Sequence, residues 1–276
     1  YKQAIKEDFL NFPDALKIFI KNESCRKKCS IIILNWNSNK LLDRCLYLIN
    51  KNTKTSFEII IVDNGSKEKQ EFKQIIEKFK IEKVIENDSN LGFSKGINQG
   101  IKLANGNNIC LMNVDAEPQE NWLENMYKTL IDNPNAGVIG PLGNEIESEY
   151  QKERMVSKDC KVMNVHFYCV LIFKEVIEKI GLLDTRFGLG GYEDNDFCIR
   201  AGLAGYECII SANSLVKHKA HQVFRLNNLD NVEIEHKNQE LLKGKLIQAL
   251  YNYGGNIDLF KLSPKIATES NLIIKE

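Results

Sequence analysis

Ile109-Cys110-Leu111-Met112-Asn113-Val114-Asp115-Ala116-Glu117-Pro118 is an apolar run that leads directly into a carboxylate. The residues from 109 to 112 are typical of a buried strand, and Pro118 cannot continue a β-ladder because it lacks an N–H. In an open α/β sheet, ligands bind outside the carboxyl ends of the strands, where a carboxylate can hold a divalent cation. Asp115 is therefore a candidate metal ligand, and an Asp that ends a strand in a turn is the alternative.

Around this stretch, strand-like runs alternate with amphipathic helical patterns. The strands are expected at 30–36, 57–62, 83–87 and 109–112, and the helices at 41–49, 72–79, 97–103 and 122–131. Such alternation is typical of βαβ units in a parallel sheet, and right-handed crossovers place the strand-to-helix loops at one edge. Residues 1–28 contain a short amphipathic helix with Pro13 near its start.

The second half of the chain is less regular. The polar segment 142–160 is expected to be a surface loop between two halves. A long strand is predicted over 162–173, a helix over 174–180, short strands at 206–210 and 215–216, and a helix over 233–251.

Composition excludes several classes of protein. Among 276 residues, 37 basic side chains balance 37 acidic ones, so no net charge attracts nucleic acid. No stretch approaches the roughly 18 apolar residues of a transmembrane helix. The eight Cys are scattered and several lie in apolar runs, which suits reduced thiols in the cytosol. These features predict a protein of the cytoplasm, either free or peripheral to the inner face of the membrane.

The ends of the predicted strands carry amide and carboxylate groups but no standard phosphate-binding loop. No G-x-G-x-x-G follows the first strand, and no G-x-x-x-x-G-K-[ST] is present. The groups that these ends provide instead are Asn35, Asp63 with Asn64, Asn90, and Asn113. They are suited to hydrogen bonds with a base and a ribose.

Two further groups of residues are candidates for chemistry. Glu193 and Asp194 follow a glycine-rich run at 188–191, and they are either the acidic cap of a helix or catalytic carboxylates. His218 follows directly after a short apolar strand. His166 lies in an apolar run and is interpreted as an interior residue.

Taken in order, several motifs resemble the family 2 glycosyltransferases of the GT-A fold, nearest to a rhamnosyltransferase-like branch. The similarity covers about 30–224. It rests on Ile32-Ile33-Leu34-Asn35-Trp36-Asn37, Val62-Asp63-Asn64-Gly65-Ser66, Asn90-Leu91-Gly92-Phe93 with Asn98 and Gly100, Asn113-Val114-Asp115, Gly191-Tyr192-Glu193-Asp194-Asn195-Asp196, and His218.

The resemblance implies a single α/β catalytic domain with a Rossmann-like, mixed, mainly parallel sheet flanked by helices. We expect it to occupy 29–224, with a nucleotide-binding half at 29–141 and an acceptor and catalytic half at 161–224. Helical extensions are expected at 1–28 and 225–276.

The resemblance also implies a role for each matching residue. The donor nucleotide would be bound by Asn35, Asp63, Asn64, Asn90, Gly92, Phe93, Asn98, Asn113 and Asp115. The metal, Mn²⁺ or Mg²⁺, would be held by Asp115 and His218. The acceptor or sugar pocket would include Gly190, Gly191 and Tyr192, and the catalytic pair would be Glu193 and Asp194, with Asp194 as the base.

The implied reaction is an inverting, metal-dependent transfer of a sugar from a UDP- or dTDP-linked donor to a hydroxyl of a glycan, lipid carrier or protein. Two positions depart from the family pattern: Asn113 replaces the first Asp of its Asp-x-Asp motif, and Phe167-Tyr168 replaces a Gly-small pair. The alternatives are a sugar-1-phosphate nucleotidyltransferase, whose triphosphate loop is not evident at 35–38, and a non-catalytic domain of the same fold that binds a glycan or partner.

Overall fold

The structure is a computed structural model that describes residues 9–25, 28–144, 151–152, 157–219, 222–227, 229 and 231–252. Its strands are β1 (Cys29–Asn35), β2 (Phe57–Asp63), β3 (Lys83–Glu86), β4 (Asn108–Asn113), β5 (Ala116–Pro118), β6 (Ala136–Leu142), β7 (Cys160–Val162), β8 (Cys169–Phe173) and β9 (Glu207–His218). Its helices are α1 (Asp14–Cys25), α2 (Asn39–Asn52), α3 (Lys69–Phe79), α4 (Phe93–Leu103), α5 (Trp122–Asp132), α6 (Lys174–Ile180), α7 (Glu193–Leu203), α8 (Gln222–Leu226) and α9 (Asn231–Asn252), with short 3-10 turns η2 (Phe9–Asn11) and η4 (Thr185–Phe187).

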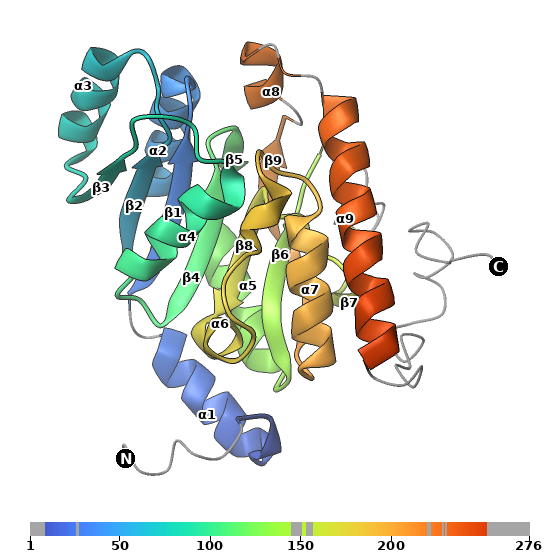
Figure 1. The fold of residues 1–276 in the computed structure, drawn as a ribbon. Coiled ribbons are helices and arrows are strands. Elements are labelled where there is room, and N and C mark those ends of the chain that lie inside the picture. The colour runs from blue at the N-terminus through green and yellow to red at the C-terminus, as the bar shows by residue number, and fades with distance from the viewer. Residues whose placement is uncertain are drawn as a thin grey trace.

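One mixed sheet organises the molecule, in the order β3-β2-β1-β4-β8-β6-β9-β5 (Figure 1). The pairs β2–β3, β1–β2, β1–β4 and β6–β9 are parallel. Strand β8 is antiparallel to both β4 and β6, so β6 and β9 point the same way as β1 to β4. The predicted mixed, mainly parallel α/β architecture is therefore confirmed.

Two strand predictions in the second half were wrong. The segment expected as one strand over 162–173 is divided, because β7 pairs with β9 whereas β8 pairs with β4 and β6. A straight strand cannot occupy both places. Conversely, the two short strands expected at 206–210 and 215–216 are one strand, β9. Its register with β6 shifts between Ser211 and Leu215, and hydroxyls in this stretch find partners in α5: Ser211 accepts from Thr129, and Ser214 donates to the Trp122 carbonyl.

Helices cover both faces of the sheet, and their close packing sets the position of the loops at its edge. Figure 1 shows α4, α6 and α7 in front of the sheet and α2 and α5 behind it. A Cβ at Gly96 or Gly100 would lie 2.5 Å from side-chain atoms of Leu34 or Ile32, so these glycines let α4 approach β1 closely. The loop that precedes α4 is thereby held against the end of the sheet.

The segment that precedes β1 is packed onto the domain through a buried lysine. Lys21, on α1, donates to the Asn133 carbonyl at 2.9 Å and the Ala136 carbonyl at 2.5 Å. Burial lowers the pKa of Lys21 to about 7. The division of the chain into a domain and two extensions stays a prediction, and parts of both predicted extensions lie outside the described residues.

The predicted surface loop at 142–160 is only partly described, and Gln151 within it is not on the surface. Its side chain is fully buried, accepting from the His166 backbone N–H at 2.9 Å and donating to the Pro141 carbonyl at 3.2 Å. Within the described ranges, no helix has the length and apolar character needed to cross a bilayer.

Candidate active site at the carboxyl edge of the sheet

Polar residues from distant parts of the chain meet where the parallel strands end. Asn35, Asp63 and Asn113 are the last residues of β1, β2 and β4, and His218 is the last residue of β9. The register places Asn35 opposite Asp63 and Leu34 opposite Asn113. Because these strands point the same way, the predicted nucleotide and metal residues share one edge of the sheet.

A buried network joins the ends of β1 and β2. The Asn35 amide donates to an oxygen of Asp63 at 3.0 Å, and Lys69 binds the other oxygen at 2.5 Å. Both Asn35 and Asp63 are 0% exposed, and Asn35 Oδ1 has no hydrogen-bond partner within the described structure. The hydrogen bond to Asp63 raises the pKa of Lys69. Lys69, which lies outside the motifs, was not anticipated from the sequence.

The loop before α4 connects the two halves of the site. Asn64 donates to the Asn90 side chain at 2.7 Å and to the Gly92 carbonyl at 3.2 Å. The Phe93 N–H donates to the Gly188 carbonyl at 2.8 Å. At Gly92, φ is +89° and a Cβ would lie 2.3 Å from that carbonyl oxygen, so this close approach requires glycine.

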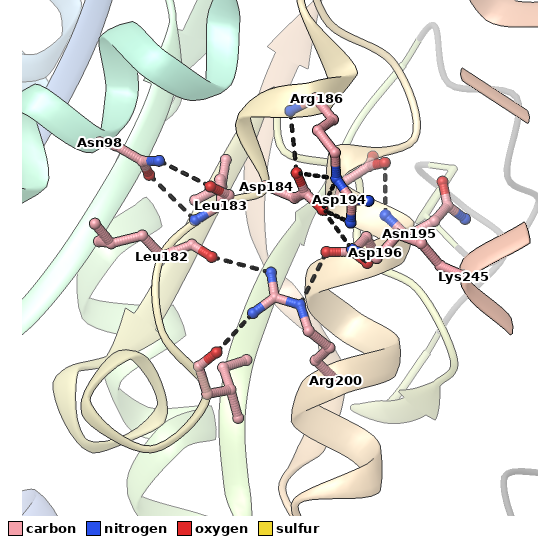
Figure 2. A network of polar contacts seen from close by, with 11 residues as sticks. Asn98, Leu182, Leu183, Asp184, Arg186, Asp194, Asn195, Asp196, Arg200 and Lys245 are labelled. Atoms are coloured by element: carbon pink, nitrogen blue, oxygen red, sulfur yellow. Dashed lines mark hydrogen bonds and ion pairs between the residues drawn. The ribbon is translucent and has the colours of Figure 1, made fainter. Parts of the chain in front are cut away.

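Asn98 has a structural partner on the same side. Its amide donates to the Leu183 carbonyl at 2.8 Å, and its side-chain oxygen accepts from the Leu183 N–H at 3.1 Å (Figure 2). Both polar atoms are therefore engaged with the segment that leads to the acidic pair. A contact of Asn98 with the nucleotide stays a prediction.

Asp115 and His218 are brought together by pairing of β5 with β9. The register sets Ala116 opposite His218, which leaves Asp115 Oδ1 3.3 Å from His218 Nε2. This Oδ1 is buried and makes no contact of hydrogen-bond geometry with a described residue. The His218 ring is stacked on Tyr168, with ring centroids 4.7 Å apart. Tyr168 is one of the residues at which the sequence departs from the family pattern, so this departure lies beside the candidate metal ligand.

This pair has the donor atoms of a metal site. A carboxylate oxygen without a hydrogen-bond partner and an imidazole nitrogen form the mixed oxygen and nitrogen set that Mn²⁺ accepts. Across the described part of the chain, no group of three His, Cys, Asp or Glu side chains is arranged to hold a metal. Glu117 is directed to Arg44, with an oxygen 3.6 Å from the guanidinium. Among the described residues, Asp115 and His218 are therefore the two candidate ligands.

The acidic pair begins α7, after a glycine-rich turn. Gly190, Gly191 and Tyr192 all have positive φ, at +129°, +93° and +70°. Tyr192 packs against an apolar cluster of Phe187, Ile199 and Leu242. A contact of Gly190, Gly191 or Tyr192 with a sugar stays a prediction. The turn leaves Glu193 and Asp194 in the first turn of a helix, where the helix dipole favours negative charge.

The two carboxyl groups have different environments. Burial, and secondly the charge of Asp194, raise the pKa of Glu193 to about 8, and Glu193 Oε2 lacks a hydrogen-bond partner among the described residues. Asp194 accepts from the Asn195 N–H at 2.8 Å (Figure 2) and lies 3.6 Å from His166 Nδ1. The side chain of His166 is 34% exposed. The interpretation of His166 as an interior residue was therefore wrong: the turn between β7 and β8 directs it to Asp194.

A three-residue segment connects the acidic pair to the metal candidates. His166 contacts Asp194, and Tyr168 contacts His218. Residues two apart have Cα atoms separated by at most about 7 Å. Three residues of chain therefore link Asp194 to the Asp115–His218 pair, and a common site for the two groups stays a prediction. No sequence signal revealed this link, because the contacts of 166 and 168 depend on the division of the predicted strand.

Solved structures show the class of fold. The chain is similar to mannosyltransferase PcManGT from Pyrobaculum calidifontis, solved with GDP-Man and Mn²⁺, with a TM-score of 0.59 at 15% identity over 74% of this chain and 64% of that one. It is also similar to GalNAc-T7, solved with UDP, GalNAc and Mn²⁺, with a TM-score of 0.60 at 16% identity over 70% of this chain and 44% of that one. The fold is that of the GT-A glycosyltransferases.

Sequence comparison then shows the family. Residues 30–181 match the model of glycosyl transferase family 2, and the chain belongs to this family. Among curated proteins, it is 30% identical over 128 residues to hyaluronan synthase of Pasteurella multocida, covering 45% of this chain and 13% of that protein. It is 24% identical over 208 residues to glycosyltransferase AglE of Haloferax volcanii, covering 69% of this chain and 66% of that protein. The chain thus spans only part of the length of these relatives.

Proposed function

We propose that this chain transfers a sugar from a nucleotide diphosphate to a hydroxyl group, with inversion at the anomeric carbon. The observation that supports the proposal is the segment 166–168, which contacts a carboxylate that begins a helix through His166 and a carboxylate–imidazole pair through Tyr168. Glycosyl transfer needs these two functions: a group that takes the proton of the acceptor, and groups that neutralise the departing diphosphate.

The donor is proposed to be a UDP- or dTDP-linked sugar. Support comes from the amide and carboxylate groups at the ends of β1 and β2 and from the loop at 90–93, held against 188. The curated relatives named above include a hyaluronan synthase, which favours a hydroxyl of a glycan as acceptor over one on a lipid carrier or protein. The rhamnosyltransferase-like branch stays a prediction, because the comparisons match the family as a whole.

Asp115 and His218 are proposed to hold the divalent cation, Mn²⁺ or Mg²⁺. Their fit rests on the buried oxygen of Asp115 that lacks a hydrogen-bond partner, and on the imidazole nitrogen beside it. When bound, such a cation acts as a Lewis acid toward diphosphate oxygens. The amide of Asn113 adds no charge, so the diphosphate itself would complete the coordination.

Asp194 is proposed as the base. The acceptor oxygen forms a bond to the anomeric carbon, the bond from that carbon to the diphosphate oxygen breaks, and the acceptor proton passes to Asp194. The raised pKa of Glu193 favours the neutral form of this side chain, so Glu193 adds less negative charge beside the base than an ordinary carboxylate would. A single base opposite the leaving group predicts inversion, by the geometric argument used for inverting glycosidases.

The test is a panel of nucleotide sugars that includes UDP-, dTDP- and GDP-linked hexoses, each with and without Mn²⁺. We expect Mn²⁺-dependent thermal stabilisation by one nucleotide class, and release of the diphosphate from the matching donor. The variant Asp194→Asn should keep the stabilisation and lose about 10²–10⁴-fold in turnover.

Other outcomes would reject the proposal. Equal turnover in Asp194→Asn would remove the base assignment. Nucleotide binding with no turnover of any donor would favour a non-catalytic domain. Formation of a nucleotide sugar from a nucleoside triphosphate and a sugar 1-phosphate would favour a nucleotidyltransferase.

A further inference from the structure

Helix α9 packs against the turn that carries the acidic pair. Figure 1 shows α9 beside α7 along one side of the molecule, although 27 residues separate the end of α7 at Leu203 from the start of α9 at Asn231. Phe187, Ile199 and Leu242 form a buried cluster, which Leu241 and Leu246 also contact. Three of these side chains belong to α9, so this small core joins α9 to both sides of the turn.

The side-chain amide of Asn238 binds the backbone of the turn at three carbonyls. Asn238 is 3% exposed, and its Nδ2 lies 2.8 Å from the Phe187 carbonyl oxygen, 2.9 Å from that of Gly190 and 3.0 Å from that of Gly191. An amide NH₂ has two hydrogens to share among these acceptors. Few side chains can satisfy three converging carbonyls, and a carboxylate at this place would repel them all.

The glycines of the turn make its conformation depend on such contacts. Gly188, Gly190 and Gly191 have φ of +58°, +129° and +93°, and glycines lose more conformational freedom on ordering than any other residue. Without the contacts from Asn238, the backbone that leads into Glu193 would sample several conformations. The direction in which the acidic pair is presented would then vary.

A second contact from α9 acts on the other side of the pair. The Lys245 ammonium binds Asp184 at 2.7 Å and also contacts Asp196 (Figure 2). Asp196 in turn accepts from Arg200 at 2.8 Å, and Arg200 donates to the Ile180 and Leu182 carbonyls. Hydrogen bonds from Arg186, and next from Lys245, hold the pKa of Asp184 well below its usual range. Lys245 therefore connects the segment before the turn to the first turn of α7.

We infer that α9 is part of the catalytic machinery, with Asn238 and Lys245 as positioning residues that hold the 188–192 turn and thereby aim Asp194. This inference rests on the proposed function, since it assumes that Asp194 takes the acceptor proton. Helix α9 lies outside residues 30–181 that match the family model and outside the segment that carries the sequence resemblance. Neither residue touches the nucleotide side of the site in the described structure.

The test compares Asn238→Asp and Lys245→Met with Lys243→Met in the full chain. The first variant keeps the shape of the side chain and replaces donors by acceptors, and the second keeps the apolar stem of the lysine. Lys243 is the control because it lies on the same helix, is 48% exposed and pairs only with Glu240 in the described contacts. Three quantities are measured: hydrogen exchange of the 188–196 amides, binding of UDP with Mn²⁺, and kcat and KM for the donor identified by the panel.

We expect Asn238→Asp to speed exchange at 188–196 by about tenfold or more and to lower kcat by about tenfold or more. KM for the donor and UDP binding should stay within about twofold, because the nucleotide side is held by other residues. Lys245→Met should act in the same direction with a smaller loss, and Lys243→Met should match the wild type. Should Asn238→Asp not fold, Lys245→Met carries the same expectation.

The inference is overturned if kcat in both α9 variants stays within about twofold of the wild type, or if kcat and UDP binding fall together. It is also overturned if exchange at 188–196 is unchanged. Failure of the proposed function is a separate result: the wild type itself would then turn over no donor, and the exchange comparison would still decide whether α9 holds the turn.

Discussion

Replacing Glu193 with Gln removes a carboxyl group that the fold holds in its neutral form. Glu193 is buried at the start of α7, beside Asp194. Burial first, and the charge of Asp194 second, raise its pKa from 4.5 to about 8. In the unfolded chain the same group titrates near its ordinary value. Over this pH interval the folded protein therefore keeps a proton that the unfolded chain releases.

The sign and size of the effect follow from this difference. Because the folded pKa is the higher one, stabilisation that is complete below pH 4.5 is lost as the pH rises toward about 8. Each pH unit in this interval lowers the free energy of unfolding by about 1.4 kcal/mol. Over the whole interval, from 4.5 to about 8, the loss is about 5 kcal/mol, which is comparable with the total stability of many domains.

The amide of the Glu193→Gln variant does not titrate, so the free energy of unfolding of the variant should increase relative to that of the wild type as the pH rises. Urea unfolding at several pH values between about 5 and about 8, followed by the fluorescence of the buried Trp122, measures the difference. Glu82→Gln is the control, because Glu82 is exposed. The reasoning fails if the difference between Glu193→Gln and wild type stays constant within about 0.5 kcal/mol over this range. Glu193 would then be ionised at neutral pH, and the acidic pair would carry two charges.

Two other substitutions test the remaining parts of the site. Asp115→Asn keeps the shape of the side chain and removes its charge, so the affinity for UDP with Mn²⁺, measured by thermal stabilisation, should fall at least about tenfold. Glu117→Gln alters a carboxylate that is directed to Arg44 and should leave this affinity unchanged. An equal loss in both variants would contradict the assignment of Asp115 as a metal ligand. Gly92→Ala should lower the free energy of unfolding by about 1–3 kcal/mol, because its Cβ would meet a carbonyl at 2.3 Å. Gly244→Ala, on α9 with nothing within 4 Å, should instead raise it by about 0.5–1 kcal/mol. Urea unfolding checks both, and equal effects of the two glycine substitutions would show that the contact between the loops is not tight.

Much of the first half of the fold could be predicted from residues that are neighbours in the sequence. The alternation of apolar strands with amphipathic helices from 30 to 131 corresponds to β1 to β4 and α2 to α5, because hydrophobic periodicity is a local property of the chain. The short edge strand β5, which ends at Pro118 and pairs with β9, was not expected. Once strands and right-handed crossovers are assigned, the polar groups that follow them must share one edge. The positions of Asn35, Asp63 and Asn113 at strand ends were therefore predictable, and so was the carboxylate that follows β4.

The second half depended on contacts between distant residues. Whether 162–173 forms one strand or two depends on which neighbours pair with each part, and the reversed direction of β8 follows from that pairing. The same division directs His166 to Asp194 and Tyr168 to His218. The place of α9 against the turn at 188–192 likewise arises only when the chain returns. A sequence pattern records which residues are apolar and which carry charge. Which of them meet is decided by the path of the whole chain, because burial and pairing depend on every element that packs around them.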